Sequence, residues 1–102
     1  MAVAKYLDLK GLLWTHVANE RRTSIQAGAR LKRKGVKSGV PDVLIFNPNS
    51  YYNGIAIELK IKPNKPTPNQ IKWLKDLNYK CWKTVVCYNL DEVINEINEY
   101  LK

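Results

Sequence analysis

The strongest constraint on the fold is an eight-residue stretch, 55–62, in which apolar side chains occupy every second position. Successive side chains of a β-strand point to opposite faces of the sheet, so this alternation predicts a strand with one apolar face. The apolar face consists of Ile55, Ile57, Leu59 and Ile61, and the opposite face of Ala56, Glu58, Lys60 and Lys62.

Capping residues predict two helices in the C-terminal half. Thr67 suits an N-cap, Pro68 the first helical position, and Gln70 the third position of a capping box. Asn89 and Glu92 repeat the cap pattern before the last helix. The apolar stripe of that helix consists of Leu90, Val93, Ile94, Ile97 and Leu101.

The N-terminal region allows two interpretations. Gly11 favours a short helix over 2–10 followed by a strand over 12–18. The spacing of its apolar residues also fits one helix over 3–17.

The remaining segments complete a mixed sheet. We expect a helix over 24–34 that ends at Gly35, strands over 42–46 and 82–88, and a hairpin connection over 47–54. This order of elements predicts an α/β sandwich formed by a single domain, 1–102. We expect the three tryptophans, Trp14, Trp73 and Trp82, in its core, together with Cys81 and Cys87 as reduced thiols. The single histidine, His16, is expected to have a packed or surface role.

The charge of the chain is strongly positive. Seventeen Lys and Arg oppose nine Asp and Glu, which gives a formal net charge of +8. Four of the acids lie in the last twelve residues, so residues 1–90 hold sixteen bases and five acids. Such a surface attracts a polyanion, and nucleic acid is the usual one. Charge alone does not separate an enzyme from a binding module.

One basic segment, 21–41, holds seven bases and no acid and is therefore expected to contact DNA phosphates. Its bases are Arg21, Arg22, Arg30, Lys32, Arg33, Lys34 and Lys37, and we expect Ser38, Lys62 and Lys65 to extend the contact surface.

Three residues form a candidate catalytic set. Glu58 and Lys60 share one face of the alternating strand, a pattern that by itself is usually a solvated sheet surface. Asp42 opens the preceding strand of the expected hairpin, so that pairing can bring Asp42 and Glu58 to one cation. Mg²⁺ prefers such hard oxygen ligands, and a lysine beside it supplies a positive charge near the attacked phosphate. The set therefore predicts a phosphodiester-cleaving site.

The motif around these residues resembles a known nuclease signature. Val40-Pro41-Asp42, followed sixteen residues after Asp42 by Glu58-Leu59-Lys60, is similar to the PD-(D/E)xK signature. More narrowly, the chain resembles the virus-type replication-repair nuclease (VRR-NUC) family over roughly residues 15–101. The segments that carry this narrower resemblance are Asn19-Glu20, Gly28-Ala29, Lys34-Gly35-Val36, Ser38-Gly39-Val40-Pro41-Asp42 and Gln70-Ile71-Lys72-Trp73-Leu74.

The resemblance implies a restriction-endonuclease-like three-layer sandwich with a central mixed β-sheet flanked by helices. It implies that Asp42, Glu58 and the backbone carbonyl of Leu59 ligate Mg²⁺ or Mn²⁺, and that Glu20 completes the acidic set. Lys60 would position or activate the attacking water. This chain departs from the family pattern at Arg21, because the pattern has a glycine directly after Asn-Glu.

Gln70 has two interpretations. It is either a helix cap or, as the resemblance implies, a residue that reaches the catalytic site.

The resemblance also implies a substrate class. Small stand-alone members resemble Holliday-junction resolvases, which act on branched DNA as homodimers. Two alternatives remain: a nuclease for flaps, nicks or duplex ends, and a non-catalytic basic nucleic-acid-binding module. We expect no organic cofactor.

The sequence predicts no membrane association. No apolar run approaches the roughly 18 residues that a spanning helix needs, and the N-terminus lacks a secretory signal. We therefore expect a cytoplasmic protein, and the resemblance is compatible with a phage-encoded nuclease that acts in the host cytoplasm.

Overall fold

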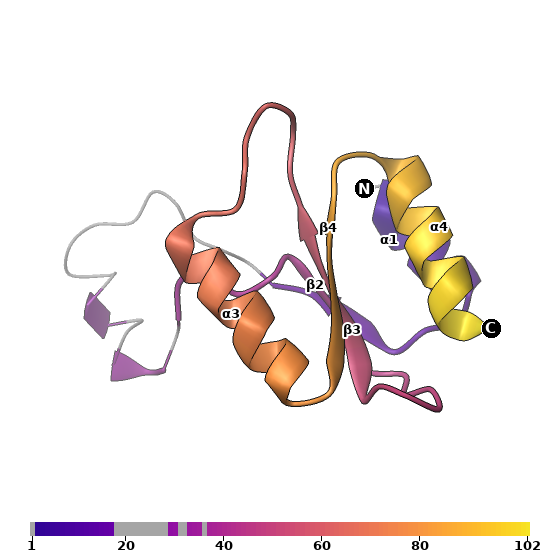
Figure 1. Ribbon diagram of the computed structural model, residues 1–102, viewed down its shortest axis with the longest axis horizontal. Helices are drawn as coiled ribbons and strands as arrows, with labels where there is room; N and C mark the ends of the chain where they lie inside the picture. The colour runs from indigo at the N-terminus through magenta and orange to yellow at the C-terminus, as the bar shows by residue number, and fades with distance from the viewer. Residues whose placement is uncertain (1, 18–28, 31–32, 36) are drawn as a thin grey trace.

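The chain folds around a four-stranded sheet with the strand order β1-β2-β3-β4. The computed structural model describes residues 2–17, 29–30, 33–35 and 37–102. The elements are α1 (Ala2–Leu9), β1 (Trp14–His16), β2 (Val43–Ile45), β3 (Gly54–Leu59), α3 (Pro68–Tyr79), β4 (Trp82–Cys87) and α4 (Leu90–Leu101). Helices α1 and α4 cover one face of the sheet and α3 lies on the other (Figure 1). The predicted three-layer α/β sandwich is confirmed.

The sheet is mixed, as the order of elements predicted. β1 pairs with β2 and β2 with β3 in antiparallel fashion, whereas β4 runs parallel to β3. The parallel step requires a crossover, which α3 provides on the way from β3 to β4. The predicted hairpin of β2 and β3 is therefore confirmed.

The buried hydrophobic core lies between the sheet and the α1–α4 layer. Ile55 and Ile57 of β3 are fully buried there, and fully burying one such side chain stabilises a fold by about 1.5–3 kcal/mol. The other buried members of this core are Val3, Leu7, Val43, Ile45, Cys87, Val93, Ile97 and Tyr100. Ile55 and Ile57, the first half of the predicted apolar face, thus form the centre of the core.

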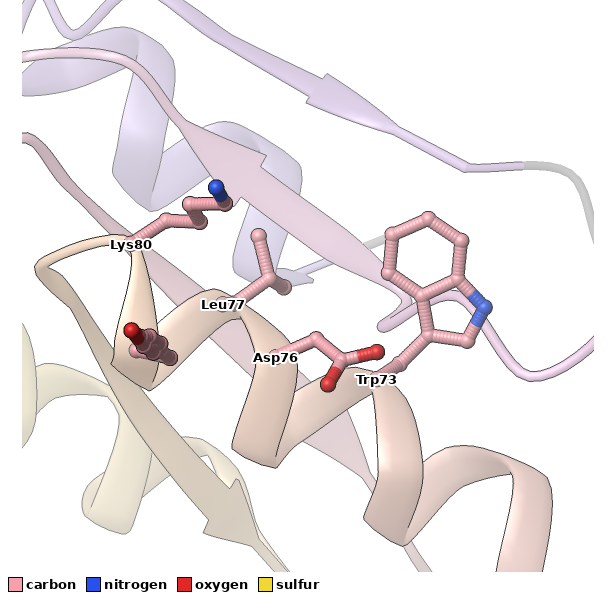
Figure 2. A pocket seen from close by; sticks show the side chains of 5 residues that line it. Trp73, Asp76, Leu77 and Lys80 are labelled. Carbon is pink, nitrogen blue, oxygen red and sulfur yellow. The ribbon is translucent and has the colours of Figure 1, made fainter.

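The α3 layer is packed more loosely. The helix begins at the predicted capping box: Thr67 Oγ1 accepts from the Gln70 N–H at 3.3 Å, and Gln70 Oε1 accepts from the Thr67 N–H at 2.8 Å. No residue of α3 is fully buried. A shallow pocket of about 330 Å³ lies along it, lined by Trp73, Asp76, Leu77, Tyr79 and Lys80. Trp73, Leu77 and Lys80 project to the same side of the helix (Figure 2).

The N-terminal region follows the first of the two interpretations. α1 ends at Leu9, and Gly11 adopts a φ of +66°, a left-handed conformation that ends helices readily only at glycine. The strand that follows is shorter than 12–18, and the single helix over 3–17 is wrong.

The helix expected over 24–34 lies largely outside the described residues. Where its end is described, Gly35 has a φ of +92°, as expected of a helix stop.

Strand β3 ends earlier than predicted. Its last ladder pair joins Leu59 to Cys87, the final residue of β4. Ile61 is therefore not part of the apolar face, and 78% of its surface is exposed. The alternation continues in the sequence, but the neighbouring strand that would support it has ended.

Three further packing predictions need correction. In α4, Leu90 and Leu101 are exposed, and Tyr100 is buried in their place. Cys87 is buried but Cys81 is exposed, because it occupies the turn between α3 and β4 with a φ of +67°. The tryptophans Trp14, Trp73 and Trp82 are half-buried, and of these Trp14 packs against the core.

Among the described residues, the structure contains no helix whose length and apolar character would allow it to cross a membrane.

Candidate active site

The hairpin register brings the two predicted carboxylates to the same end of the sheet. Val43 pairs with Ile57, so one further step places Asp42, which precedes β2, opposite Glu58. Because side chains alternate along a strand, Asp42 and Glu58 share the face opposite to the one that Val43 and Ile57 bury under α1 and α4. They therefore lie on the α3 side of the sheet.

Asp42 is held by the neighbouring strand. Its Oδ2 accepts a hydrogen bond from the backbone N–H of Leu59 at 2.8 Å. On its other side, the backbone carbonyl of Asp42 accepts from the N–H of Val17 at 2.7 Å. The start of β2 is thus tied to both flanking strands, which limits the positions that the carboxylate can adopt.

The carboxylate of Glu58 is buried, and only one of its two oxygens lies near a positive charge in the described part of the chain. Its side chain is 2% exposed, and Lys60 Nζ lies 3.8 Å from its Oε2. Among the described residues, the other oxygen, Oε1, has no hydrogen-bond partner. Burying a carboxylate oxygen without a partner is costly, and each such group in a native structure calls for an explanation such as an ion.

The electrostatics of the pair favour protonation of Glu58. Its pKa is raised from 4.5 to about 7, first by burial, then by the negative charge of Asp42 and a hydrogen bond with that carboxylate. The ammonium of Lys60 opposes this rise. Two neighbouring carboxylates repel one another unless a proton or a cation lies between them.

Lys60 stands at the point where β3 ends. Its backbone N–H donates to the carbonyl of Cys87 at 2.9 Å. Its side chain is 16% exposed, so it is more accessible to solvent than that of Glu58, which is 2% exposed.

The turn before Asp42 is fixed by α3. Trp73 Nε1 donates to the carbonyl of Ser38 at 3.1 Å, and Asn69 Nδ2 donates to Ser38 Oγ at 3.0 Å. Gly39 has a φ of +84°, and a Cβ there would lie 2.8 Å from the backbone carbon of Asn69. Only glycine fits this close approach.

The comparisons with known proteins agree with this geometry. A sequence model of the VRR-NUC domain matches residues 3–89. The chain belongs to the VRR-NUC family. A solved structure described as a VRR_NUC domain protein superimposes with a TM-score of 0.74 at 30% sequence identity, covering 86% of this chain. This chain spans 66% of the length of that protein. No curated protein sequence matches the chain significantly.

This match confirms the predicted family. VRR-NUC is a nuclease-type family. The roles of the individual residues stay predictions. Asp42, Glu58, Leu59 and Lys60 come together at one end of the β2–β3 hairpin, as the motif predicted. Glu20 lies outside the described residues. Within the described part of the chain, no group of three or more His, Cys, Asp or Glu side chains could hold a metal ion.

Gln70 lies at the start of α3, where its side-chain oxygen is engaged in the capping box. The structure therefore supports the cap interpretation, and a role for Gln70 in the VRR-NUC site stays a prediction.

The basic residues expected to contact DNA divide into two groups. Those that the structure describes are all exposed, namely Arg30, Arg33, Lys34, Lys37, Lys62 and Lys65. Arg21, Arg22 and Lys32 lie outside the described residues. Ser38 is exposed, but both of its oxygens accept hydrogen bonds from α3, which gives it a structural role.

Two residues at this site were not singled out by the sequence. Asn69 and Trp73 hold the turn that leads to Asp42. Trp73 was expected in the core, and it also lies in the segment 70–74 that carries the family resemblance. No sequence signal identified the contact of either residue with the turn, because the contact joins segments more than thirty residues apart.

Proposed function

We propose that this VRR-NUC chain is a metal-dependent endonuclease that hydrolyses DNA phosphodiester bonds. The observation that carries the proposal is the buried Glu58 Oε1, which has no hydrogen-bond partner among the described residues. It belongs to a carboxylate that faces Asp42 and lies 3.8 Å from the ammonium of Lys60. A divalent cation would satisfy this oxygen and relieve the repulsion between the carboxylates.

The oxygen donors at the hairpin end fit Mg²⁺ or Mn²⁺. Asp42, Glu58 and the backbone carbonyl of Leu59 would hold the cation, with Glu20 completing the set. Carboxylates and carbonyls are the ligands that these hard cations prefer, and Mg²⁺ commonly binds through only one or two carboxylates. When bound, the cation supplies positive charge that polarises the phosphate and lowers the pKa of a water molecule.

The side chains of the site would then act on the phosphodiester directly. The ammonium of Lys60 donates hydrogen bonds to a non-bridging phosphate oxygen or to the attacking water, and so stabilises the charge that develops in the transition state. A water oxygen forms the new bond to phosphorus, the bond from phosphorus to the leaving sugar oxygen breaks, and the proton that the water loses ends on that leaving oxygen. The N–H of Leu59 keeps Asp42 in place during these steps.

The charge distribution supports DNA as the substrate. Lys37, Lys62 and Lys65 are exposed beside the segments that carry Asp42 and Lys60, and the whole chain has a net charge of +8. Lysines placed along a backbone track neutralise phosphates and position the duplex. We further propose branched DNA as the preferred substrate and a homodimer as the active form, because a four-way junction needs two matched cuts.

The test is cleavage of an end-labelled four-way junction and of a linear duplex of matching sequence in Mg²⁺ or Mn²⁺. Wild type is compared with Glu58→Gln, which keeps the shape of the side chain, and with Asp76→Asn, an exposed acid on α3 that serves as the control. We expect paired symmetric cuts near the junction for wild type and Asp76→Asn, and loss of cutting in Glu58→Gln.

Other outcomes distinguish the alternatives. Cutting of both DNAs to the same extent would retain the nuclease and remove the preference for branched DNA. Flapped and nicked duplexes of the same sequence are included, and cutting confined to flaps, nicks or duplex ends would assign a different substrate. If neither DNA is cut, and wild type and Glu58→Gln bind both DNAs equally well, the chain is a basic binding module and the proposed function is wrong.

A further inference from the structure

The segment that joins β3 to α3, residues 60–67, projects beyond the end of the sheet (Figure 1). We call it the β3–α3 loop. It begins with Lys60, so it leaves the body of the protein at the candidate active site. A substrate bound at Lys60 must therefore meet this loop.

Hydrogen bonds define the shape of the β3–α3 loop. At its start, the N–H of Lys60 donates to the carbonyl of Cys87 at 2.9 Å. Within it, the N–H of Asn64 donates to the carbonyl of Ile61 at 2.9 Å and closes a four-residue turn. Pro63 and Pro66 restrict the backbone further, because the proline ring holds φ near one value. The loop presents its side chains from a defined backbone.

The charge of the loop suits a polyanion. Lys60, Lys62 and Lys65 lie within eight residues, and no acid occurs between Glu58 and Asp76. The ammonium of Lys62 lies 5.7 Å from the ring centre of Tyr88, which follows β4. This contact places the positive charge of Lys62 at the same end of the sheet as Lys60. Such a surface favours nucleic acid over an apolar protein partner.

Ile61 is the exception in this basic loop. It lies between Lys60 and Lys62, and 78% of its surface is exposed, whereas Ile55 and Ile57 of β3 are fully buried. A single exposed apolar residue is common and means little alone. Here, however, the residue directly follows the candidate catalytic lysine in a loop that has lysines and no acid.

A loop with several lysines and one exposed apolar side chain is suited to contact DNA. Lysines that neutralise phosphates bring the loop against the DNA backbone. An apolar side chain among them reaches the sugars and base faces between the phosphate strands, where proteins insert Ile, Leu, Phe or Met as wedges that partly unstack a base step. Unstacking costs less where the bases are already separated, as at a branch point.

We propose that Ile61 inserts into DNA beside the cleaved phosphodiester and unstacks the adjacent bases. This inference rests on the proposed nuclease function and names the residue that supplies the unstacking a continuous duplex requires and a branch point does not. Ile61 acts as a specificity residue, and its loss leaves the metal ligands and Lys60 unchanged.

The first measurement reads base unstacking without cleavage. Glu58→Gln protein is bound, with and without Mn²⁺, to a duplex that carries 2-aminopurine beside the mapped cleavage position. We expect fluorescence to rise on binding and the rise to disappear when Ile61→Ser is added. Leu9→Ser is the matched control, because Leu9 is 86% exposed on α1, and it should leave the rise unchanged.

The second measurement reads specificity in the active protein. Ile61→Ser should cut the continuous duplex about tenfold more slowly than wild type, because the stacked bases of that duplex must first be separated. A substrate with two unpaired bases at the same position should be cut within about twofold of the wild-type rate. Urea unfolding should be the same for both proteins, since Ile61 is exposed.

Three outcomes would overturn the proposal. They are an undiminished fluorescence rise in Ile61→Ser, equal slowing on both substrates, and an equal effect of Leu9→Ser. Failure of the proposed function is distinguishable, because wild type would then cut neither DNA and no cleavage position could be mapped, whereas failure of this inference leaves wild-type cleavage intact and removes only the dependence on Ile61.

Discussion

The carboxylate of Asp42 accepts a hydrogen bond from the backbone N–H of Leu59, with 2.8 Å between Oδ2 and N. This bond lies beyond the last pair of the ladder, Val43 with Ile57, so a side chain takes the place of a backbone acceptor at the end of the hairpin. Asp42 therefore has a structural function, and under the proposed function its carboxylate would also ligate the cation.

The two functions of Asp42 can be separated by substitution. Asp42→Asn keeps a side-chain oxygen for the Leu59 N–H but loses the charge, whereas Asp42→Ala loses both. We expect Asp42→Ala to be less stable than Asp42→Asn by about 1 kcal/mol, the usual net value of one hydrogen bond. Both variants should lose Mn²⁺ binding in calorimetry. Retention of wild-type Mn²⁺ affinity by Asp42→Asn would contradict the assignment of Asp42 as a ligand.

Glu58 should make the metal-free protein less stable as the pH rises. Its pKa is raised from 4.5 to about 7 in the folded state, mainly by burial. Below pH 4.5 the carboxyl is protonated in both states and costs nothing. As the pH rises towards 7, the unfolded chain releases the proton first, so the free energy of unfolding falls, and above about pH 7 the loss is complete.

Glu58→Gln removes this ionisation and should stabilise the metal-free protein at pH 8 by up to about 3 kcal/mol, with little gain at pH 4. Urea unfolding in EDTA at both pH values measures the difference. A gain that is the same at the two pH values would show that the ionisation of Glu58 is not its cause.

Gly39 should tolerate a side chain less well than another glycine with a similar backbone. Gly39 and Gly11 both have positive φ, but a Cβ at Gly39 would meet Asn69 at 2.8 Å, and one at Gly11 would meet nothing within 4 Å. Gly11→Ala should cost about 1–2 kcal/mol from backbone strain alone. Gly39→Ala should cost roughly 1–3 kcal/mol more, because Asn69 must move.

Gly39→Ala should also slow DNA cleavage, since Gly39 belongs to the turn that α3 holds immediately before Asp42. Thermal unfolding and initial cleavage rates at a temperature where both variants are folded give the two readouts. Equal costs for the two glycines would show that the contact with Asn69 is unimportant.

The two cysteines should differ in reactivity. Cys81 is exposed, whereas Cys87 is buried and its pKa is raised to about 12 by burial and by the charges of Glu96 and Glu92. The thiolate is the reactive form, so at pH 8 a thiol reagent should modify one cysteine rapidly and the second only on unfolding. Mass spectrometry identifies the labelled residue. Rapid labelling of Cys87 in the folded protein would contradict its burial in the core.

Local patterns predicted most of the secondary structure. The capping box at Thr67 and the cap at Asn89 identified the starts of α3 and α4, because caps depend on residues within one helical turn. The alternation from Ile55 to Leu59 identified β3 and its buried face. The end of β3 was not predictable in the same way, since it depends on where β4 stops supporting it.

The residues of the candidate site were predictable from the sequence, but their burial and their hydrogen bonds were not. The motif named Asp42, Glu58 and Lys60, and the hairpin signal implied that the two carboxylates meet. The burial of Glu58, the hydrogen bond from Leu59 to Asp42, and the support from Asn69 and Trp73 could not be read from the chain. Each depends on contacts between distant segments, which no local pattern encodes.

The sequence by itself determined the order of the elements, the apolar face of the sheet, the family and the residues of the candidate site, because these follow from periodicity, capping and motif. Only the tertiary structure decided that the side chain of Glu58 is buried and that the side chain of Ile61 is exposed to solvent. Desolvation is set by what packs against a side chain in three dimensions, and two residues of the same strand pattern can therefore have opposite surroundings.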